Sequence, residues 1–158
     1  HIMASNLRSI TDAIANLSIS YTNEAGATVT PTAKDINQIP VSVAAADAPI
    51  RLVGVVDEGG NESRMDFIAV DDNVEYMHEI IEKCLVESVG LSRRMDELPD
   101  QQRYSDAMLS KLADSRSIYT NSDIVAPTFC KRDVIEWPEG TDEHWYAVIT
   151  HITVRELA

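Results

Sequence analysis

Apart from His1, the chain has three histidines that could do acid–base or metal chemistry: His78, His144 and His151. His144 and His151 lie an odd number of residues apart in a run that alternates like one β-strand. Successive strand side chains point to opposite faces, so these two imidazoles cannot bind one ion without a bulge. We interpret them as ordinary strand residues. The alternative is a small hydrolase or metal-dependent enzyme that uses His78 or His151 with nearby carboxylates.

Other residues with chemical potential lack the spacing that their chemistry needs. The acidic segments 57–62 and 71–75 do not follow the loop pattern of a calcium site. Cys84 and Cys130 are far apart and lack the spacing of zinc ligands. Neither a glycine-rich phosphate loop nor a serine nucleophile elbow is found. The sequence therefore predicts no catalytic residue, no cofactor and no metal, and so no enzyme.

Length and charge limit the class of protein. The chain has 158 residues, enough for one domain, which we expect to span 4–158 because His1-Ile2-Met3 looks like a vector remnant. The formal net charge is −13, which disfavours specific binding of nucleic acid or of an anionic membrane. Half of the 26 acidic residues lie in 57–100. No secretory leader and no membrane span is expected, so we predict a cytoplasmic location with both cysteines as thiols.

The first half of the chain predicts one helix and two strands. Apolar residues recur at helical spacing from Asn6 to Leu17, and Ser5 or Asn6 can cap the helix start. Ile50–Val56 is almost continuously apolar, which is typical of a buried strand. A second extended run, Met65–Val70, follows a long acidic connection, and the two runs together predict a hairpin. Between the helix and the first of these strands, only a short strand at Thr28–Thr30 is expected.

The second half predicts one helix and a long hairpin. A helix begins at Pro99 and ends near Ser115, with Tyr104, Met108, Leu109 and Leu112 as its buried stripe. Ile124–Trp137 and His144–Glu156 are extended runs joined by a turn. The segment Glu75–Glu87 fits a helix or a strand by pattern alone. The order of these elements predicts an α+β fold: a largely antiparallel sheet with two main helices packed on it.

Four segments, in this order, resemble parts of phage tail-terminator and head–tail joining (neck) proteins. Ile39–Leu52 is similar to the loop that enters the family's first core strand, and Met77–Leu91 to a long strand ending at a glycine. Leu98–Leu109 resembles a helix that opens with a Leu-Pro pair, and Trp145–Val154 resembles the last strand. The likeness runs from Leu7 to Glu156 and favours a strand for Tyr76–Val86.

This resemblance implies a structural virion protein, assembled in the host cytoplasm, that works without transforming any molecule. Family members form rings, commonly hexamers, at the head–tail junction, where they end tail-tube growth and dock the tail to the head. The implied partners are therefore further copies of the chain, a tail-tube protein and a head-completion protein. DNA would pass through the ring without specific binding, which suits a negatively charged wall.

A ring needs two different patches on each subunit, one for each neighbour. The residues expected to contact neighbouring subunits are Asp57, Glu58, Arg64, Arg93 and Arg94, which lie in two charged loops.

A partner-binding module stays open as a third class of function. Its contacts would come from an aromatic surface made of Trp137, Trp145 and Tyr146.

Overall fold

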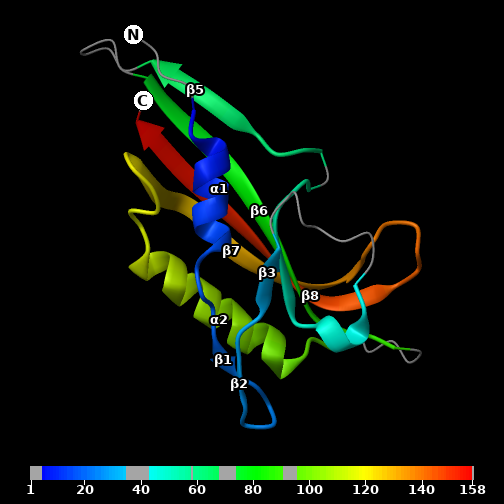
Figure 1. Cartoon of the computed structure of the whole chain (residues 1–158). Helices are drawn as coiled ribbons and strands as arrows, with labels where there is room; N and C mark the ends of the chain where they lie inside the picture. The colour runs from blue at the N-terminus through cyan, green and yellow to red at the C-terminus, as the bar shows by residue number, and fades with distance from the viewer. Residues whose placement is uncertain (1–4, 35–42, 58, 68–73, 91–95, 158) are drawn as a thin grey trace.

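The computed structural model describes residues 5–34, 43–57, 59–67, 74–90 and 96–157, and Figure 1 shows the course of the chain. Within these residues the chain forms two α-helices, one 3₁₀ turn and eight strands. They are α1 (Leu7–Ala15), β1 (Tyr21–Thr22), β2 (Thr28–Val29), β3 (Thr32–Lys34), η1 (Ala45–Asp47), β4 (Ile50–Val55), β5 (Ser63–Phe67), β6 (Val74–Ser88), α2 (Pro99–Asp114), β7 (Ser122–Glu136) and β8 (His144–Leu157). The α+β class is confirmed.

One sheet of six strands organises the molecule. Its order is β3-β4-β6-β8-β7, and β5 pairs with a further part of β6. All pairings are antiparallel except that of β3 with β4, so the sheet is largely antiparallel as predicted. The short strands β1 and β2 form a separate hairpin. Neither described helix is long and apolar enough to cross a membrane.

Strand β6 confirms the strand expected at Tyr76–Val86, but the hairpin predicted from β4 and β5 is wrong. β8 pairs with β6 from Glu75 to Ser88 and so occupies one edge along nearly its whole length. On the other edge, β4 pairs with Ile81–Leu85 and β5 with Val74–His78. The two short strands therefore lie one after the other along β6 because that strand is long enough for both. Val70, the predicted end of the second run, lies outside the described residues.

The C-terminal hairpin is confirmed, and its side chains separate onto two faces. Trp145, Ala147 and Ile149 belong to one apolar cluster, while Val148 and Ile152 belong to another. This is the alternation expected of a strand that is buried on both sides. Trp145 is 2% exposed and Tyr146 is 1% exposed, so the aromatic surface proposed for a binding module is wrong: both rings pack inside the molecule.

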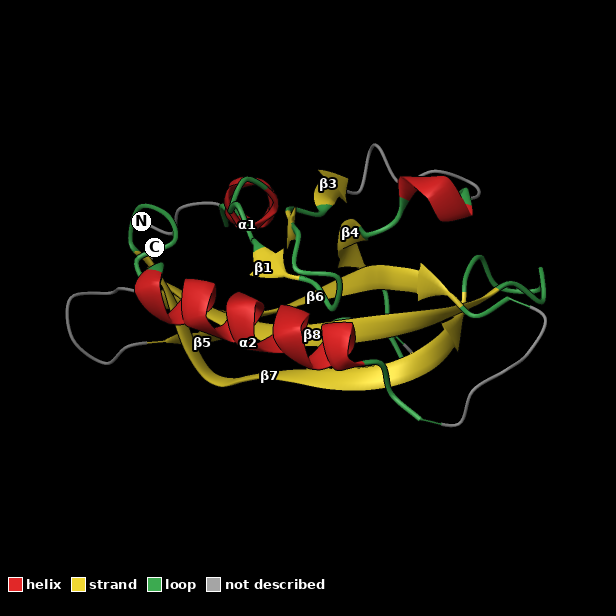
Figure 2. Ribbon diagram, turned by 90° about the horizontal axis from the view of Figure 1, so that it is seen from below, coloured by secondary structure: helices red, strands yellow, loops and turns green. Residues whose placement is uncertain are grey.

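The two helices cover one face of the sheet. Ile10 and Ile14 of α1 share a buried cluster with Tyr104 and Met108 of α2. α2 runs along β7 and β8, and α1, seen end-on in Figure 2, lies near β4. The predicted stripe of α2 holds except at Leu109, which is 37% exposed. Two polar residues of α2, Gln101 and Ser105, are buried instead.

Within the described residues, neither α1 nor α2 covers the opposite face of the sheet. At the end near β4, Leu52, Leu85 and Trp145 form a second buried cluster with Val43. β4 bends within this region, since its pairing with β6 shifts register between Val53 and Val55. The residue at the bulge is Gly54 at φ +83°, a left-handed conformation that other residues rarely adopt.

Candidate functional site

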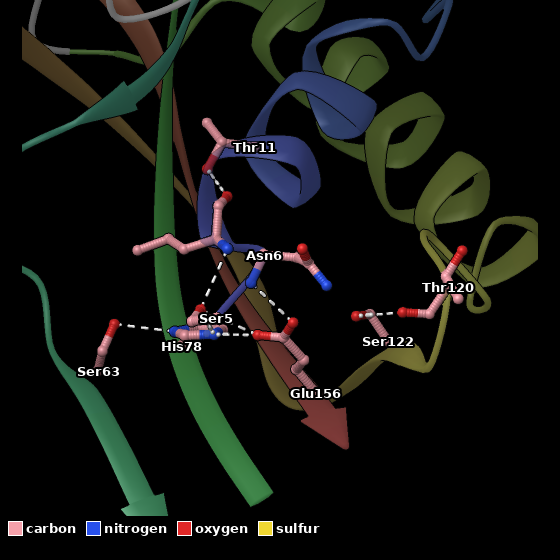
Figure 3. A network of polar contacts seen from close by, with 9 residues as sticks. Ser5, Asn6, Thr11, Ser63, His78, Thr120, Ser122 and Glu156 are labelled. Atoms are coloured by element: carbon pink, nitrogen blue, oxygen red, sulfur yellow. Dashed lines mark hydrogen bonds and ion pairs between the residues drawn. The ribbon is translucent and has the colours of Figure 1, made fainter. Parts of the chain in front are cut away.

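His78 and Glu156 form a buried polar pair beneath the start of α1. His78 comes from β6 and Glu156 from the neighbouring strand β8, and the two point to the helix side of the sheet (Figure 3). Each side chain is 1% exposed, and Nε2 of His78 lies 3.0 Å from Oε1 of Glu156. A buried carboxylate is stable as an anion only when donors surround it, so its partners decide what this pair can do.

Two serine hydroxyls lie within hydrogen-bond distance of this pair. Ser63 Oγ, on the exposed strand β5, lies 2.9 Å from Nδ1 of His78. Ser5 Oγ lies 3.1 Å from Nε2 of His78 and donates to Oε1 of Glu156 at 3.0 Å. The row Ser63–His78–Glu156 thus places a hydroxyl, an imidazole and a carboxylate in hydrogen-bonded sequence, which is the arrangement of a nucleophile, a base and its orienting acid.

The same carboxylate also anchors helix α1. Oε2 of Glu156 accepts the backbone N–H of Asn6 at 2.8 Å, and Ser5 Oγ accepts the N–H of Leu7 at 3.1 Å. Burial alone would raise the pKa of Glu156, but the hydrogen bonds from His78, Asn6 and Ser5 outweigh it and lower that pKa. Of the two residues predicted to cap α1, Ser5 therefore accepts a backbone N–H of the helix with its side chain. Asn6 takes part only through its own backbone N–H, which donates to Glu156.

A second buried cluster lies at the other end of α1. Arg51 of β4 is 1% exposed and Glu82 of β6 is 0% exposed, and Nε of the arginine lies 2.6 Å from Oε1 of the carboxylate. The guanidinium also donates to the carbonyls of Leu17, at 2.6 Å, and Ile14, at 3.1 Å. The hydroxyl of Tyr104, from α2, donates to the second oxygen of Glu82. One ion pair thus joins both helices to the sheet.

The groups around this second cluster are held in their uncharged forms. Burial, and then the charge of Glu82, raise the pKa of the Tyr104 hydroxyl and of the Cys84 thiol well above their usual ranges. Burial also raises the pKa of Cys130 to about 11. Both cysteines are free, as predicted. Neither thiol has the thiolate character that a nucleophile needs at neutral pH.

The sheet face opposite α1 and α2 holds an open groove of about 1230 Å³. Its wall combines apolar Ile149 and Trp137 with charged residues, among them Lys83 and Lys131. The ammonium of Lys83 lies 6.0 Å from the ring centre of Trp137. Because Asp57, Asp133, Glu136 and Glu139 also line it, the groove is a mixed surface of apolar side chains and charges of both signs.

His151 belongs to this groove and not to the buried pair. Its ring stacks on Phe129 with centroids 4.6 Å apart, and its Nε2 lies 3.7 Å from Oδ2 of Asp57. His144 instead contacts Asp142 in the turn of the hairpin, so the two histidines of β8 serve different regions. Among the described residues, no three of the His, Cys, Asp and Glu side chains come together as metal ligands.

Of the five residues expected to contact neighbouring subunits, the structure describes two, and it does not bring them together. Asp57 lies in the groove, where its Oδ1 is 3.9 Å from Nζ of Lys83. Arg64 lies on β5, exposed, with its Nε 3.2 Å from Oδ2 of Asp66. Glu58, Arg93 and Arg94 lie outside the described residues.

The buried residues Arg51, Glu82 and Glu156 are missing from the sequence-based predictions. The alternation of buried and exposed positions along the strands could have indicated the two glutamates. Glu82 interrupts an apolar face of β6, and Glu156 has the same parity in β8 as the buried Val148 and Ile152. A charged residue at a position of buried parity indicates a buried ion pair or hydrogen-bond network.

No protein-family model matches the chain, and no curated protein sequence is similar to it.

Proposed function

We propose that the protein is a structural component of a phage virion, a tail terminator or related head–tail joining protein that works as a closed ring of identical subunits. The observation that carries the proposal is that, within the described residues, the two sides of the sheet end in different strands: β3 and β5 on one side and β7 on the other. Within the described residues, β5 pairs only with β6 and β7 pairs only with β8. Unpaired strand edges are ready surfaces for contact with another chain.

Two unlike edges favour a ring over a simple dimer. When one patch of a subunit meets a different patch of the next, each added copy leaves a free patch at either end, and only closure satisfies both. β5 and β7 lie on opposite sides of the sheet, separated by β6 and β8. This geometry supports repeated head-to-tail association.

The charge of the chain agrees with a passage for DNA. A formal charge of −13 per subunit is multiplied in a ring, and a wall of that sign repels phosphates instead of holding them. We propose the virion as its location, after assembly in the host cytoplasm, with the tail-tube protein and a head-completion protein as partners.

The buried polar residues also support a structural role. The carboxylates of Glu82 and Glu156 each hold a helix to the sheet, and each is 1% exposed or less. Groups used in this way are not free to bind a substrate.

A small hydrolase is the second candidate, favoured by the row Ser63–His78–Glu156. It ranks lower because His78 and Glu156 are each 1% exposed, and neither the groove beside His151 nor the hollow beside α2 includes them. A serine-directed fluorophosphonate probe decides this point. Labelling that is lost in Ser63→Ala but retained in Ser5→Ala would support the hydrolase, and absence of labelling in the native protein would exclude a reactive serine.

Solution mass and tube assembly test the proposed function. Sedimentation velocity over a wide concentration range, with and without purified tail-tube protein, should reveal one closed oligomer, and electron microscopy should show it as a ring. Added before polymerisation, the protein should shorten tail tubes in proportion to its concentration. A monomer under every condition, without effect on tube length, would refute the proposal.

A further inference from the structure

The outer edge of β7 is unpaired along the second half of the strand. Within the described residues β7 pairs only with β8, and in Figure 2 it forms one side of the sheet. Nearer its start this edge is occupied, because the N–H of Ile124 donates to the carbonyl of Arg116 at 2.7 Å. Pro127 has no N–H to offer. The free part of the edge is therefore Phe129–Glu136, whose inner side pairs with β8 without interruption.

The backbone of this segment points hydrogen-bonding groups outward at alternate residues. Trp137, the residue after β7, donates its N–H at 2.9 Å to the carbonyl of the residue before β8. Since this direction alternates along an antiparallel strand, the groups of Cys130, Arg132 and Val134 point away from β8. The N–H of Val134 accordingly donates to the side chain of Asp133, at 2.7 Å. That partner is an exposed side chain, which a second strand can displace.

The charges of the segment are self-complementary. Lys131 and Asp133 stand on either side of Arg132, and both are exposed and line the groove. In an antiparallel pair of two β7 strands with the twofold axis at Arg132, Lys131 of each copy faces Asp133 of the other. A register moved by two residues in either direction would place Lys131 opposite Lys131 or Asp133 opposite Asp133, and like charges repel. Arg132 meets its symmetry mate, but its guanidinium is already paired with Glu97 of the same chain.

The apolar side chains match in the same register. Phe129 faces Ile135 of the other copy on the groove side of the sheet, and Cys130 faces Val134 on the helix side. Phe129 is 39% exposed although it is large and apolar, so this contact would remove it from water. The outward N–H and C=O groups also meet, because Cys130 faces Val134 and Arg132 faces Arg132. Charge, apolar contact and backbone hydrogen bonding therefore select one register.

We propose that the free protein is a twofold dimer in which the Phe129–Glu136 segments of two copies pair antiparallel and join two sheets into one. The occupant of the edge is a second copy, because the pattern of this segment complements itself. The role of the dimer rests on the proposed function: an edge paired in this way cannot join another strand, so the dimer keeps the β7 edge covered until ring assembly. The contact itself does not depend on that role.

Charge reversal and its rescue test the register. Lys131→Glu puts like charges opposite each other twice in each dimer, so the dimer dissociation constant in sedimentation equilibrium should rise roughly tenfold or more. Asp133→Lys should have the same effect. The double variant Lys131→Glu/Asp133→Lys should restore the dimer, because opposite charges then face each other again.

The matched control is Lys111→Glu, which makes the same change of charge on α2, outside the strand. Its dissociation constant should stay within about twofold of that of the native protein. Circular dichroism and thermal unfolding should show all four variants folded like the native protein, since Lys131 and Asp133 are exposed.

Crosslinking locates the twofold axis. In a Cys130→Ser background, Arg132→Cys places two cysteines opposite each other at a Cα distance of about 5.5 Å, which a disulfide can span. This variant should give dimers and no larger product. Glu136→Cys is the control, because residue 136 faces Thr128 of the other copy and lies far from its own symmetry mate. Crosslinking from Glu136→Cys as strong as from Arg132→Cys would overturn the proposal.

The outcomes separate this inference from the proposed function. A free protein that stays monomeric at every concentration, or that passes from monomer to ring without a dimer, would overturn the β7 pairing. So would a dimer that charge reversal leaves intact. Rings formed with tail-tube protein would in each case still support the proposed function. A dimer that responds to these variants as expected, but never converts to rings or affects tube length, would confirm the pairing and overturn the proposed function.

Discussion

Removing one partner of the buried Arg51–Glu82 pair should destabilise the fold strongly. Glu82→Leu leaves the guanidinium of Arg51 at the interior with only the carbonyls of Ile14 and Leu17 as partners. An uncompensated buried charge of this kind costs about 3–5 kcal/mol. At this chain length, that loss corresponds to a fall in Tm of about 6–20 °C. Arg51→Met should destabilise the fold to a similar extent, because it leaves the carboxylate of Glu82 without its charged partner.

The double variant Arg51→Met/Glu82→Leu should be less damaging than the sum of the two single variants. It removes both charges together and loses mainly the two helix carbonyl bonds and the Tyr104 hydroxyl bond, at about 1 kcal/mol each, or about 2–3 kcal/mol in all. Urea unfolding followed by circular dichroism gives the free energy for each member of the cycle. Arg103→Met is the matched control. Its partner Asp100 is at a similar distance, 2.8 Å, but the pair is partly exposed, so the change should stay within about 0.5 kcal/mol.

Additive losses in this cycle would refute the reasoning. They would mean that Arg51 and Glu82 each stabilise the fold through separate contacts, and that charge pairing across β4 and β6 contributes little.

Three further predictions follow from the buried polar groups. The pKa of Glu156 is lowered in the fold, so its carboxylate contributes to the free energy of unfolding above the ordinary carboxyl pKa of about 4.3. That contribution is lost as pH falls through the lower pKa of the folded state, and Glu156→Gln should therefore make the free energy of unfolding depend less on pH in this acid range. Gln101→Leu should cost about 2 kcal/mol in urea unfolding, because the amide of this fully buried residue bonds two backbone carbonyls and the backbone N–H of Leu98. Cys84 and Cys130 should react with a thiol reagent at pH 8 far more slowly in the native protein than in denaturant, because burial raises both pKa values.

The sequence pattern was sufficient for elements whose evidence is local. The alternation of His144–Glu156 and the proline at position 99 each mark their own element, and both predictions are confirmed. The pairing of Ile50–Val55 was not predictable in this way. β4 pairs with the edge of β6 that β8 does not occupy, and that arrangement is a property of the whole sheet.

The buried charges were harder to predict because sequence position does not show which charge meets which. His78 was singled out as a possible base, yet its partner Glu156 lies at the far end of the chain and Ser63 lies on another strand. Arg51 sits within an apolar strand, where its nearest sequence neighbours give no acid to pair with. Only the antiparallel registers of β6 with β4 and β8 bring these groups together.

Both clusters act on α1, and this explains why buried charge is retained in a small domain. α1 has nine residues, shorter than the roughly 12–15 that an isolated helix needs for marginal stability. It has no acidic residue in its first turn and no basic residue in its last. The sheet supplies both: the carboxylate of Glu156 accepts an N–H at the start of the helix, and the guanidinium of Arg51 donates to carbonyls at its end. Each charge matches the helix dipole, so α1 is fixed at both ends by the strands beneath it.

Side chains of β4 and β8 bond both ends of α1, and the hydroxyl of Tyr104 joins α2 to Glu82 of β6. A subunit of the proposed ring would need an interior fixed in this way. His78, Glu82 and Glu156 are used in these buried contacts, whereas Met65 of β5 and Leu109 of α2 remain exposed. The proposed assembly role requires a fixed interior and unlike strands at the two sides of the sheet, and this is the reason we propose that the function lies at those edges.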